Sequence, residues 1–232
     1  MTIQRCPDGL ILPANTPTLH PDSTFELPVC IQATLAQNNK ISIGAFTGIY
    51  GGRIGHCMIG RYCSIASGVD IASDQHPTDW LSSSMIQYVP NLHGWGDWLK
   101  RNEFDYINPE KMFMSNTPVN IGNDVWIGQG VFIKSGVNIG HGAVIAAHSV
   151  VVNDIPSYAI AAGVPAKVKK YRFTDDLIKR LLNIKWWEYN ISSINNIDFS
   201  NVENALSLLE ERISQGNLIP FNFKSVKYED IK

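Results

Sequence analysis

The sequence predicts a mainly β protein, a parallel β-helix of hexapeptide repeats with an inserted loop and a C-terminal helical segment. Three features of the stretch from residue 121 to residue 151 predict the β-helix. Glycine directly follows several of the repeated isoleucines, and a second apolar or small series trails the first by four residues. The first series recurs at every sixth residue, at Ile121, Ile127, Ile133, Ile139, Ile145 and Val151. A strict short period is typical of a solenoid, and six fits neither a helical stripe nor an alternating strand.

Each six-residue unit is expected to form one flat side of the β-helix, a short strand followed by a turn. Three sides then make one coil, and successive coils stack at strand spacing, about 4.8 Å. The inward aliphatic side chains of stacked coils would form the core. Glycine after the inward residue permits a tight corner that a side chain would strain.

An earlier and less regular block of repeats begins at Ile43. Its period is six from Ile59 to Ile71, but two units near Gly51 and Cys57 are one residue short. The repeat stops at residue 72 and resumes at Val119. We therefore expect one β-helix over residues 41–171, interrupted by an inserted loop at 72–118.

The inserted loop holds three of the six tryptophans and several other aromatic residues. Disordered segments are poor in aromatic residues, and long loops inside compact folds are often functional. An ordered functional excursion is the interpretation that the composition favours.

The two ends of the chain are expected to cap and extend the β-helix. Residues 1–40 are rich in Pro, Thr and Asn, and their segment 25–31 reads as an edge strand or an imperfect first repeat. Prolines favour an edge position, and a solenoid needs its end covered. Residues 172–232 form a helical segment and tail: Thr174 is a good N-cap for a first helix, and an apolar stripe predicts a second over about 201–214.

Composition and charge exclude several classes of function. The formal net charge of −2 gives no reason to expect nucleic acid or an anionic membrane as partner. No apolar run reaches the roughly 18 residues of a transmembrane helix, and the first residues do not read as a signal peptide. The four cysteines lack CxxC spacing, so a zinc site is not expected. These features predict a reduced, cytoplasmic protein without a bound metal.

Several motifs together resemble one branch of the hexapeptide-repeat acyltransferases. They are the two repeat blocks, a histidine at the start of the loop, the GVPAK element at 163–167 and the IKWWEY sequence at 184–189. The branch contains the xenobiotic acetyltransferases of the streptogramin and type B chloramphenicol types and related sugar O-acetyltransferases. The resemblance covers about Ile41 to Tyr189. It implies a left-handed β-helix, acetyl-CoA as cosubstrate, and a homotrimer with sites between subunits.

His76 is the candidate general base. Acetyl transfer from a thioester to a hydroxyl needs a base for the hydroxyl proton, and histidine titrates near neutrality. His76 lies where the loop leaves the repeats, and in the similar enzymes a histidine at this point is the base. A partner must orient the ring; Asp74, Asp79 or a backbone carbonyl would serve. The remaining histidines read as turn or loop residues, His93 within the loop among them.

The resemblance also implies a binding surface for acetyl-CoA. Trp126 should point outward and lie beside the pantetheine arm, Ala147 should offer backbone contacts, and Lys167 and Lys170 should approach the phosphates. The two lysines belong to a basic cluster with Lys169 and Arg172. The sequence departs from its relatives at 152–153, where Val-Asn stands in place of Thr-Lys.

Acceptor contacts are expected from the inserted loop. Its candidate residues are Asp79, Trp80, Tyr88 and Trp95, since aromatic rings pack against a sugar ring or an aromatic drug alike. This composition does not decide between the two acceptors. The sequence SDQHPTDW at 73–80 resembles the sugar branch more than the antibiotic branch, and this resemblance implies a hydroxyl acceptor on a sugar or glycan, with an antibiotic acceptor or amino-sugar N-acetylation as alternatives.

Two further classes of protein remain to be weighed. A catalytically silent scaffold would need neither His76 nor the GVPAK element. A metal-dependent carbonic anhydrase would need three histidine ligands, and the spacing of His141 and His148 does not match that arrangement.

Overall fold

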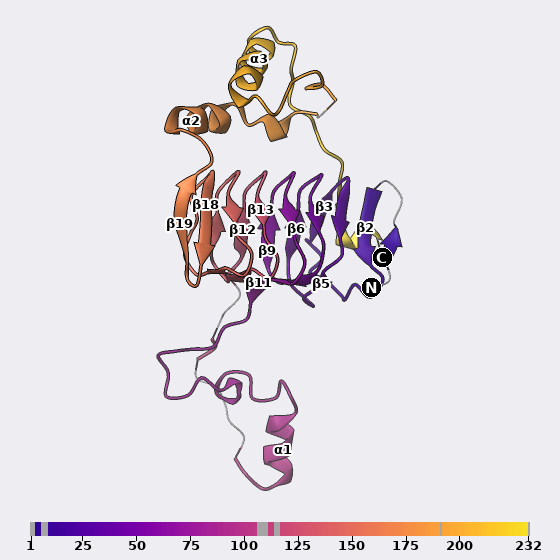
Figure 1. The fold of residues 1–232 in the computed structure, drawn as a ribbon. Coiled ribbons are helices and arrows are strands. Elements are labelled where there is room, and N and C mark those ends of the chain that lie inside the picture. The colour runs from indigo at the N-terminus through magenta and orange to yellow at the C-terminus, as the bar shows by residue number, and fades with distance from the viewer. Residues whose placement is uncertain (1–2, 6–8, 106–110, 114–116, 191, 232) are drawn as a thin grey trace. The chain divides into compact units, whose positions relative to one another are not determined.

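The computed structural model describes residues 3–5, 9–105, 111–113, 117–190 and 192–231. The chain divides into two compact units, one made of residues 1–73 and 118–232 and one made of residues 74–117. Each unit is described by itself. The larger unit contains a parallel β-helix (Figure 1).

Three sheets form the walls of the β-helix. The first sheet, called sheet A here, consists in spatial order of β1 (Ile3–Arg5), β2 (Leu10–Pro13), β4 (Val29–Ile31), β7 (Gly48–Ile49), β10 (Ser64–Ile65), β13 (Trp126–Ile127), β16 (Val144–Ile145), β18 (Ala159–Gly163) and β19 (Ala166–Tyr171). Sheet B consists of β15 (Asn138–Ile139), β12 (Val119–Ile121), β9 (Cys57–Ile59), β6 (Ile41–Ile43), β3 (Thr24–Glu26) and β20 (Ser225–Lys227). Sheet C consists of β17 (Val150–Val151), β14 (Phe132–Lys134), β11 (Val69–Ser73), β8 (Gly52–Ile54) and β5 (Thr34–Leu35).

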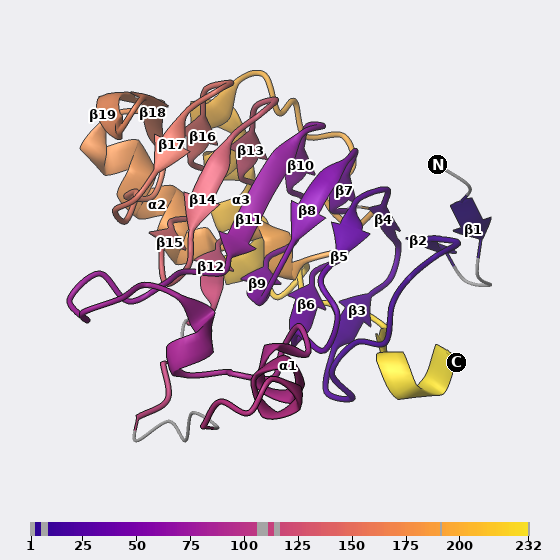
Figure 2. The same cartoon turned by 90° about the horizontal axis from the view of Figure 1, so that it is seen from below.

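The strands of successive coils pair in parallel and in register, which confirms the predicted solenoid (Figure 2). In sheet A, Ile65 is the register partner of Ile127, and Ile127 is the partner of Ile145. Each repeated isoleucine therefore stacks on the isoleucine one coil away. The pairing continues across the inserted loop, because Ile71 of β11 is the partner of Ile133 of β14.

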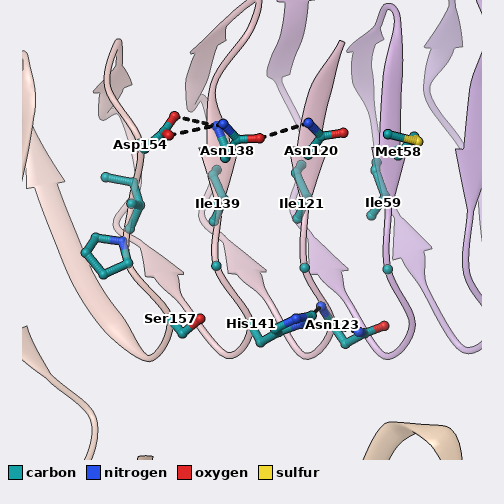
Figure 3. Close-up of a pocket in the computed structure, with 15 residues that line it drawn as sticks. Met58, Ile59, Asn120, Ile121, Asn123, Asn138, Ile139, His141, Asp154 and Ser157 are labelled. Atoms are coloured by element: carbon teal, nitrogen blue, oxygen red, sulfur yellow. Dashed lines mark hydrogen bonds between the residues drawn. The ribbon is translucent and has the colours of Figure 1, made fainter. Parts of the chain in front are cut away.

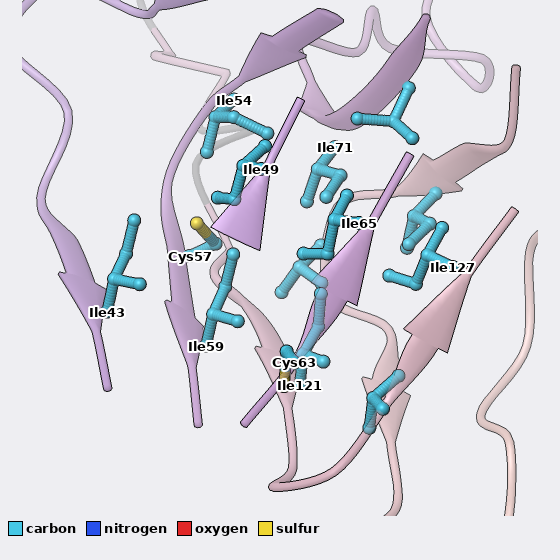
Figure 4. Packing of buried hydrophobic residues seen from close by; sticks show 14 of the residues in the cluster. Ile43, Ile49, Ile54, Cys57, Ile59, Cys63, Ile65, Ile71, Ile121 and Ile127 are labelled. Carbon is cyan, nitrogen blue, oxygen red and sulfur yellow. The ribbon is translucent and has the colours of Figure 1, made fainter. Parts of the chain in front are cut away.

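The core of the β-helix is the set of columns that these inward side chains form (Figure 4). Ile65, Ile71 and Ile127 have no exposed surface. Burying one such side chain stabilises the fold by roughly 1.5–3 kcal/mol. The second series lies at the corners and is equally buried; its polar member, Ser149, accepts a hydrogen bond from the Gly163 amide at 3.1 Å.

The β-helix extends farther toward the N-terminus than the predicted start at residue 41. Strands β2, β3, β4 and β5 pair in parallel within the same three sheets. Phe25 and Ile31 are register partners of Ile43 and Ile49, so segment 25–31 is an imperfect repeat. A phenylalanine at an aliphatic position and the proline Pro28 hid the period there. Antiparallel strands cover the stack instead: β1 on β2, β20 on β3, and β19 on β18.

The predicted slip in register occurs at the two corners that flank β8, where the inward residues Ile49, Ile54 and Ile59 follow one another at five residues instead of six. Ile49 and Ile65 are therefore register partners only sixteen residues apart, whereas Ile127 and Ile145 are eighteen apart. Two glycines, Gly51 and Gly52, make the corner between β7 and β8 with φ values of 142° and 104°. A Cβ on Gly52 would lie 2.1 Å from the Val69 carbonyl oxygen, so only glycine fits the close approach of the two coils.

Two helices follow the β-helix, as predicted. The helix α2 (Asp175–Ile184) begins after Thr174 and ends where Lys185 takes a left-handed φ of 50°. The helix α3 (Val202–Ser214) begins after its N-cap Asn201, whose side chain accepts a hydrogen bond from the Asn204 backbone amide. A short 3₁₀ turn, η3 (Trp186–Glu188), follows α2, and η4 (Tyr228–Ile231) follows β20.

The C-terminal segment is fastened to one corner of the β-helix. The Arg61 guanidinium donates to both oxygens of Glu26, at 2.6 and 2.8 Å, and to the Trp187 carbonyl at 3.2 Å. The same guanidinium lies 4.1 Å from the centre of the Phe223 ring. Burial alone would raise the pKa of Glu26, but the hydrogen bonds and charge of Arg61 hold that pKa below its usual value.

The smaller unit is the inserted loop, residues 74–117. It contains a 3₁₀ turn, η2 (Met85–Gln87), and the helix α1 (Trp95–Arg101). Three aromatic rings, Trp80, Tyr88 and Phe113, pack against one another with centroids 5.6 to 6.0 Å apart. This cluster gives the insertion a small apolar centre of its own.

Candidate active site

His76 lies at the start of the inserted loop with one ring nitrogen held by two oxygens. Its Nδ1 is 2.9 Å from the Ser83 carbonyl oxygen and 3.0 Å from the Tyr88 hydroxyl. A carbonyl can only accept a hydrogen bond, so its contact with Nδ1 favours a proton on that nitrogen. Nε2 is then left with a free lone pair, which is the state that a general base requires.

The carbonyl of Ser83 is one of the orienting partners that the sequence allows. A carboxylate from Asp74 or Asp79 is not needed for this role, because the backbone already supplies the acceptor. The ring nitrogen is reached by a residue seven positions later in the same loop. The loop therefore folds back on itself around the histidine.

The four loop residues expected at the acceptor differ in exposure. Asp79 is exposed, Trp80 is partly exposed and the Trp95 side chain is 40% exposed, with its ring tilted against His93. Tyr88 is only 6% exposed. The Tyr88 ring is buried in the aromatic cluster and its hydroxyl contacts His76, so the contact of Tyr88 with an acceptor stays a prediction.

The predicted cofactor residues share one outer surface of sheet A and its neighbouring corner. Trp126 is the register partner of Val144, Val144 of Ile160, and Ile160 of Lys170. Register partners point to the same side of a sheet, so Trp126 and Lys170 face the same way across three strand spacings, about 14 Å. Trp126 is 58% exposed, as the sequence predicts.

The GVPAK element is the turn between β18 and β19. Lys167 is the register partner of Ala162 and is exposed, and a shift of register between Ile160 and Ala161 brings Lys170 to the same outer side. Ala147 is exposed at the corner that follows β16, and its amide would lie 2.5 Å from a Cβ on Gly128. The backbone at this corner is thus open on one side and closely packed on the other.

Arg172 does not belong to the predicted basic cluster. Its guanidinium forms an ion pair with Asp124 at 3.0 Å and donates to the Gly142 carbonyl at 2.8 Å. It also lies against the rings of Phe173 and Tyr158, at 5.1 and 5.5 Å from their centres. Arg172 therefore fastens the end of β19 to the coils, and the exposed charges are the lysines.

A shallow groove runs along the outer surface of sheet B (Figure 3). One side is a ladder of polar side chains in which Asn120 donates to Asn138 at 2.8 Å and Asn138 donates to Asp154 at 3.0 Å. The other side holds Asn123 and His141. The sequence analysis missed this ladder, although its two asparagines lie eighteen residues apart, one full coil.

Comparison with known proteins identifies the family. The family described as bacterial transferase hexapeptide (six repeats) matches residues 118–153. A probable macrolide acetyltransferase of Lysinibacillus sphaericus is 38% identical over 167 residues, which are 70% of this chain and 86% of that protein. This chain belongs to the hexapeptide-repeat acyltransferase family.

Two other relatives of this hexapeptide-repeat protein differ in the acceptor that they are named for. A chloramphenicol acetyltransferase of Klebsiella aerogenes is 39% identical over 140 residues, which are 59% of this chain and 61% of that protein. A galactoside O-acetyltransferase of Escherichia coli (strain K12) is 47% identical over 70 residues, which are 27% of this chain and 34% of that protein. The chain thus spans about three fifths of the chloramphenicol enzyme's length.

The described residues show neither of two other kinds of site. They contain no group of three His, Cys, Asp or Glu side chains placed to hold a metal ion. Over the same ranges, every helix of this hexapeptide-repeat protein is too short or too polar to cross a membrane.

His141 is a packed side chain in this hexapeptide-repeat protein, not the exposed turn residue that the sequence suggests. Its ring stacks on Trp187 with centroids 4.7 Å apart, and its Nδ1 accepts a hydrogen bond from the Asn123 amide at 2.9 Å. Burial and the charge of Lys185 lower the pKa of His141, against an opposing effect of Glu188. Folding therefore favours the neutral form of the His141 ring.

Acidification from pH 7 to pH 5 is expected to destabilise the fold through His141. Below the ordinary histidine pKa of about 6.5, the unfolded chain binds a proton that folded His141 resists, so stability falls as the pH falls. The binding of one proton can change the free energy of unfolding by at most about 1.4 kcal/mol per pH unit. A partly exposed ring contributes only part of this change. Thermal melts of the wild type and His141→Phe at both pH values measure the effect. The pH dependence should shrink in His141→Phe and persist in the control His20→Asn; an unchanged dependence in His141→Phe contradicts this assignment.

Proposed function

We propose that this protein transfers the acetyl group of acetyl-CoA to a hydroxyl group of a sugar or glycan, with His76 as general base. The observation that carries the proposal is the contact of His76 Nδ1 with the Ser83 carbonyl, which leaves Nε2 free. Family membership supplies the reaction class, since the relatives above are named acetyltransferases.

The chain's own groups account for the proton transfers of such a reaction. Acetyl-CoA supplies an activated acetyl group when bound. His76 Nε2 takes the proton of the acceptor hydroxyl as the acceptor oxygen bonds to the acetyl carbon. The imidazolium then returns this proton to the departing thiol sulfur, so the enzyme ends in its starting state. No covalent acetyl-enzyme is required.

The outer surface of sheet A fits the chemistry of coenzyme A. Trp126 offers an exposed aromatic ring, the corner at Ala147 offers open backbone, and Lys167 and Lys170 offer positive charge on the same side. An elongated molecule with a polar arm and phosphates matches this order of groups. Lysines on the edge strand β19 also discourage pairing with another chain, so their role in binding needs a direct test.

Replacing Lys167 and Lys170 with alanine is expected to weaken acetyl-CoA binding about three- to tenfold at moderate salt, as two exposed charge contacts of up to about 1 kcal/mol each allow. Isothermal calorimetry on the double variant measures the change. The matched control removes two exposed lysines elsewhere, Lys179→Ala with Lys227→Ala. Equal affinity in the two double variants rejects the phosphate role.

The sugar acceptor is supported by the exposed Trp95, the partly exposed Trp80 and the exposed Asp79 of the inserted loop, since aromatic faces and carboxylates suit sugar rings and hydroxyls. An antibiotic acceptor is the second candidate, because the longer matches are to proteins named for chloramphenicol and macrolides. An amino-sugar amine is a third. Thiol release from acetyl-CoA with galactosides, amino sugars, chloramphenicol and macrolides as acceptors separates them; no release with any of them rejects the proposal.

We also propose that the protein is a homotrimer whose sites lie between subunits. The support is the three-sheet β-helix, since flat walls pack around a threefold axis. Light scattering tests this assembly, and a stable, active monomer contradicts it.

A further inference from the structure

We propose that Tyr88 is a positioning residue for His76. Its hydroxyl and the Ser83 carbonyl together hold the imidazole in the tautomer that leaves Nε2 free. The inference rests on the proposed function, which makes His76 the base. Tyr88 acts through His76 and needs no contact with either substrate.

The Ser83 carbonyl oxygen and the Tyr88 hydroxyl oxygen both contact the same nitrogen of His76, Nδ1. Ser83 O and the Tyr88 hydroxyl lie 2.9 and 3.0 Å from Nδ1. The carbonyl can only accept, whereas a hydroxyl can donate or accept. With the proton on Nδ1, both oxygens accept from it in a shared hydrogen bond. With the proton on Nε2, the carbonyl would face the bare lone pair of Nδ1, which is unfavourable.

The Tyr88 hydroxyl is held in place by the burial of its ring. Tyr88 is 6% exposed and packs edge-on to Trp80, with centroids 5.8 Å apart and planes at 90°. It also packs against Phe113 at 5.6 Å. A tyrosine has two rotatable side-chain bonds, and contact on two sides fixes both. His76 itself is exposed, so its orientation depends on these fixed partners.

The contact is expected to matter most when the base is charged. Proton uptake at Nε2 makes the ring a cation, and hydrogen bonds from a charged donor are roughly twice as strong as neutral ones. The Tyr88 and Ser83 oxygens then stabilise the imidazolium that forms in the transition state. Losing one of the two acceptors should slow the reaction without weakening substrate binding.

The test replaces Tyr88 with phenylalanine, which keeps the ring and removes the hydroxyl. We expect kcat to fall about three- to tenfold, as the loss of one hydrogen bond allows, with KM for both substrates unchanged. Nitrogen-15 NMR of the His76 ring should show the Nδ1–H tautomer in the wild type, and the Nδ1 resonance should shift in Tyr88→Phe because its proton loses one acceptor. Tyr50→Phe makes the same chemical change at an exposed site in the other unit and should change neither measurement.

Two results overturn the proposal. One is an unchanged Nδ1 resonance and an unchanged kcat in Tyr88→Phe, which reduces Tyr88 to packing. The other is a wild-type ring in the Nε2–H form, in which Tyr88 would donate to Nδ1 and block the base. The NMR arm needs no acetyl transfer, so it decides the role of Tyr88 even if the acceptor screen fails. A fully active His76→Ala would instead reject the proposed function.

Discussion

Replacing His76 with alanine is expected to lower kcat by about 10² to 10⁴-fold, the usual contribution of a general base. Affinity for acetyl-CoA should stay nearly intact, because the base acts on the acceptor proton, which moves only in the transition state. Steady-state kinetics and calorimetry on the same preparation measure the two quantities. The side chain is exposed, so a thermal melt should show little loss of stability.

The matched control for His76→Ala is His93→Ala, the other histidine of the inserted loop. His93 packs against Trp95, and its replacement by alanine should lower the activity far less than that of His76. If His76→Ala kept more than about a tenth of the wild-type rate, it would fall outside the range of a general base and the assignment would be wrong. If His93→Ala were the inactive variant, His93 would be the base.

Replacing Gly52 with alanine is expected to destabilise the β-helix by about 3 kcal/mol or more, in the range of large single-site effects. Two costs add at this position. The φ of 104° disfavours any side chain, and the new Cβ would stand 2.1 Å from the Val69 carbonyl oxygen. The Val69 carbonyl belongs to β11, whose backbone is paired with β8. This pairing prevents the carbonyl from moving away from the new Cβ. Chemical denaturation of the two proteins measures the difference.

Gly216→Ala separates the two costs. Gly216 also has a positive φ, 70°, but nothing lies within 4 Å of its would-be Cβ. It should therefore show only the conformational cost of a left-handed φ, roughly 1–2 kcal/mol. Equal losses in the two variants would mean that the close approach of the coils at Gly52 contributes nothing.

The β-helix was predictable because its core residues recur at every sixth position. Neither a helix nor an isolated strand produces this period. Stacked isoleucines one coil apart made both the walls and the position of the insertion visible in the sequence. The N-terminal coils were not predictable, since Phe25 and Leu35 fill the core without an aliphatic period or flanking glycines. In these coils the side chains fill the core by their volume, and the sequence shows no repeat that reveals their inward direction.

The candidate site was predictable only in part. The exposure of His76 and Trp126 follows from their places relative to the repeats, whereas their proposed roles rest on the family resemblance. The partners of His76 could not be predicted, because the inserted loop has no period from which to read its folding. The surroundings of Arg172 and His141 were predicted wrongly for a related reason. Their partners, Asp124 and Trp187, lie 48 and 46 residues away in the sequence.

The insertion interrupts the chain without interrupting the stack. Ile71 and Ile133 remain register partners across 62 residues, and the Ser135 hydroxyl donates to the Ser73 carbonyl at 2.8 Å where the chain leaves the wall. Lengthening such a closed loop is inexpensive, about 0.6 kcal/mol for each doubling. A gene could therefore exchange the segment between residues 74 and 117 as a cassette. If the proposed sites are correct, acceptor preference would then diverge by recombination while sheet A, the proposed coenzyme A surface, stays the same.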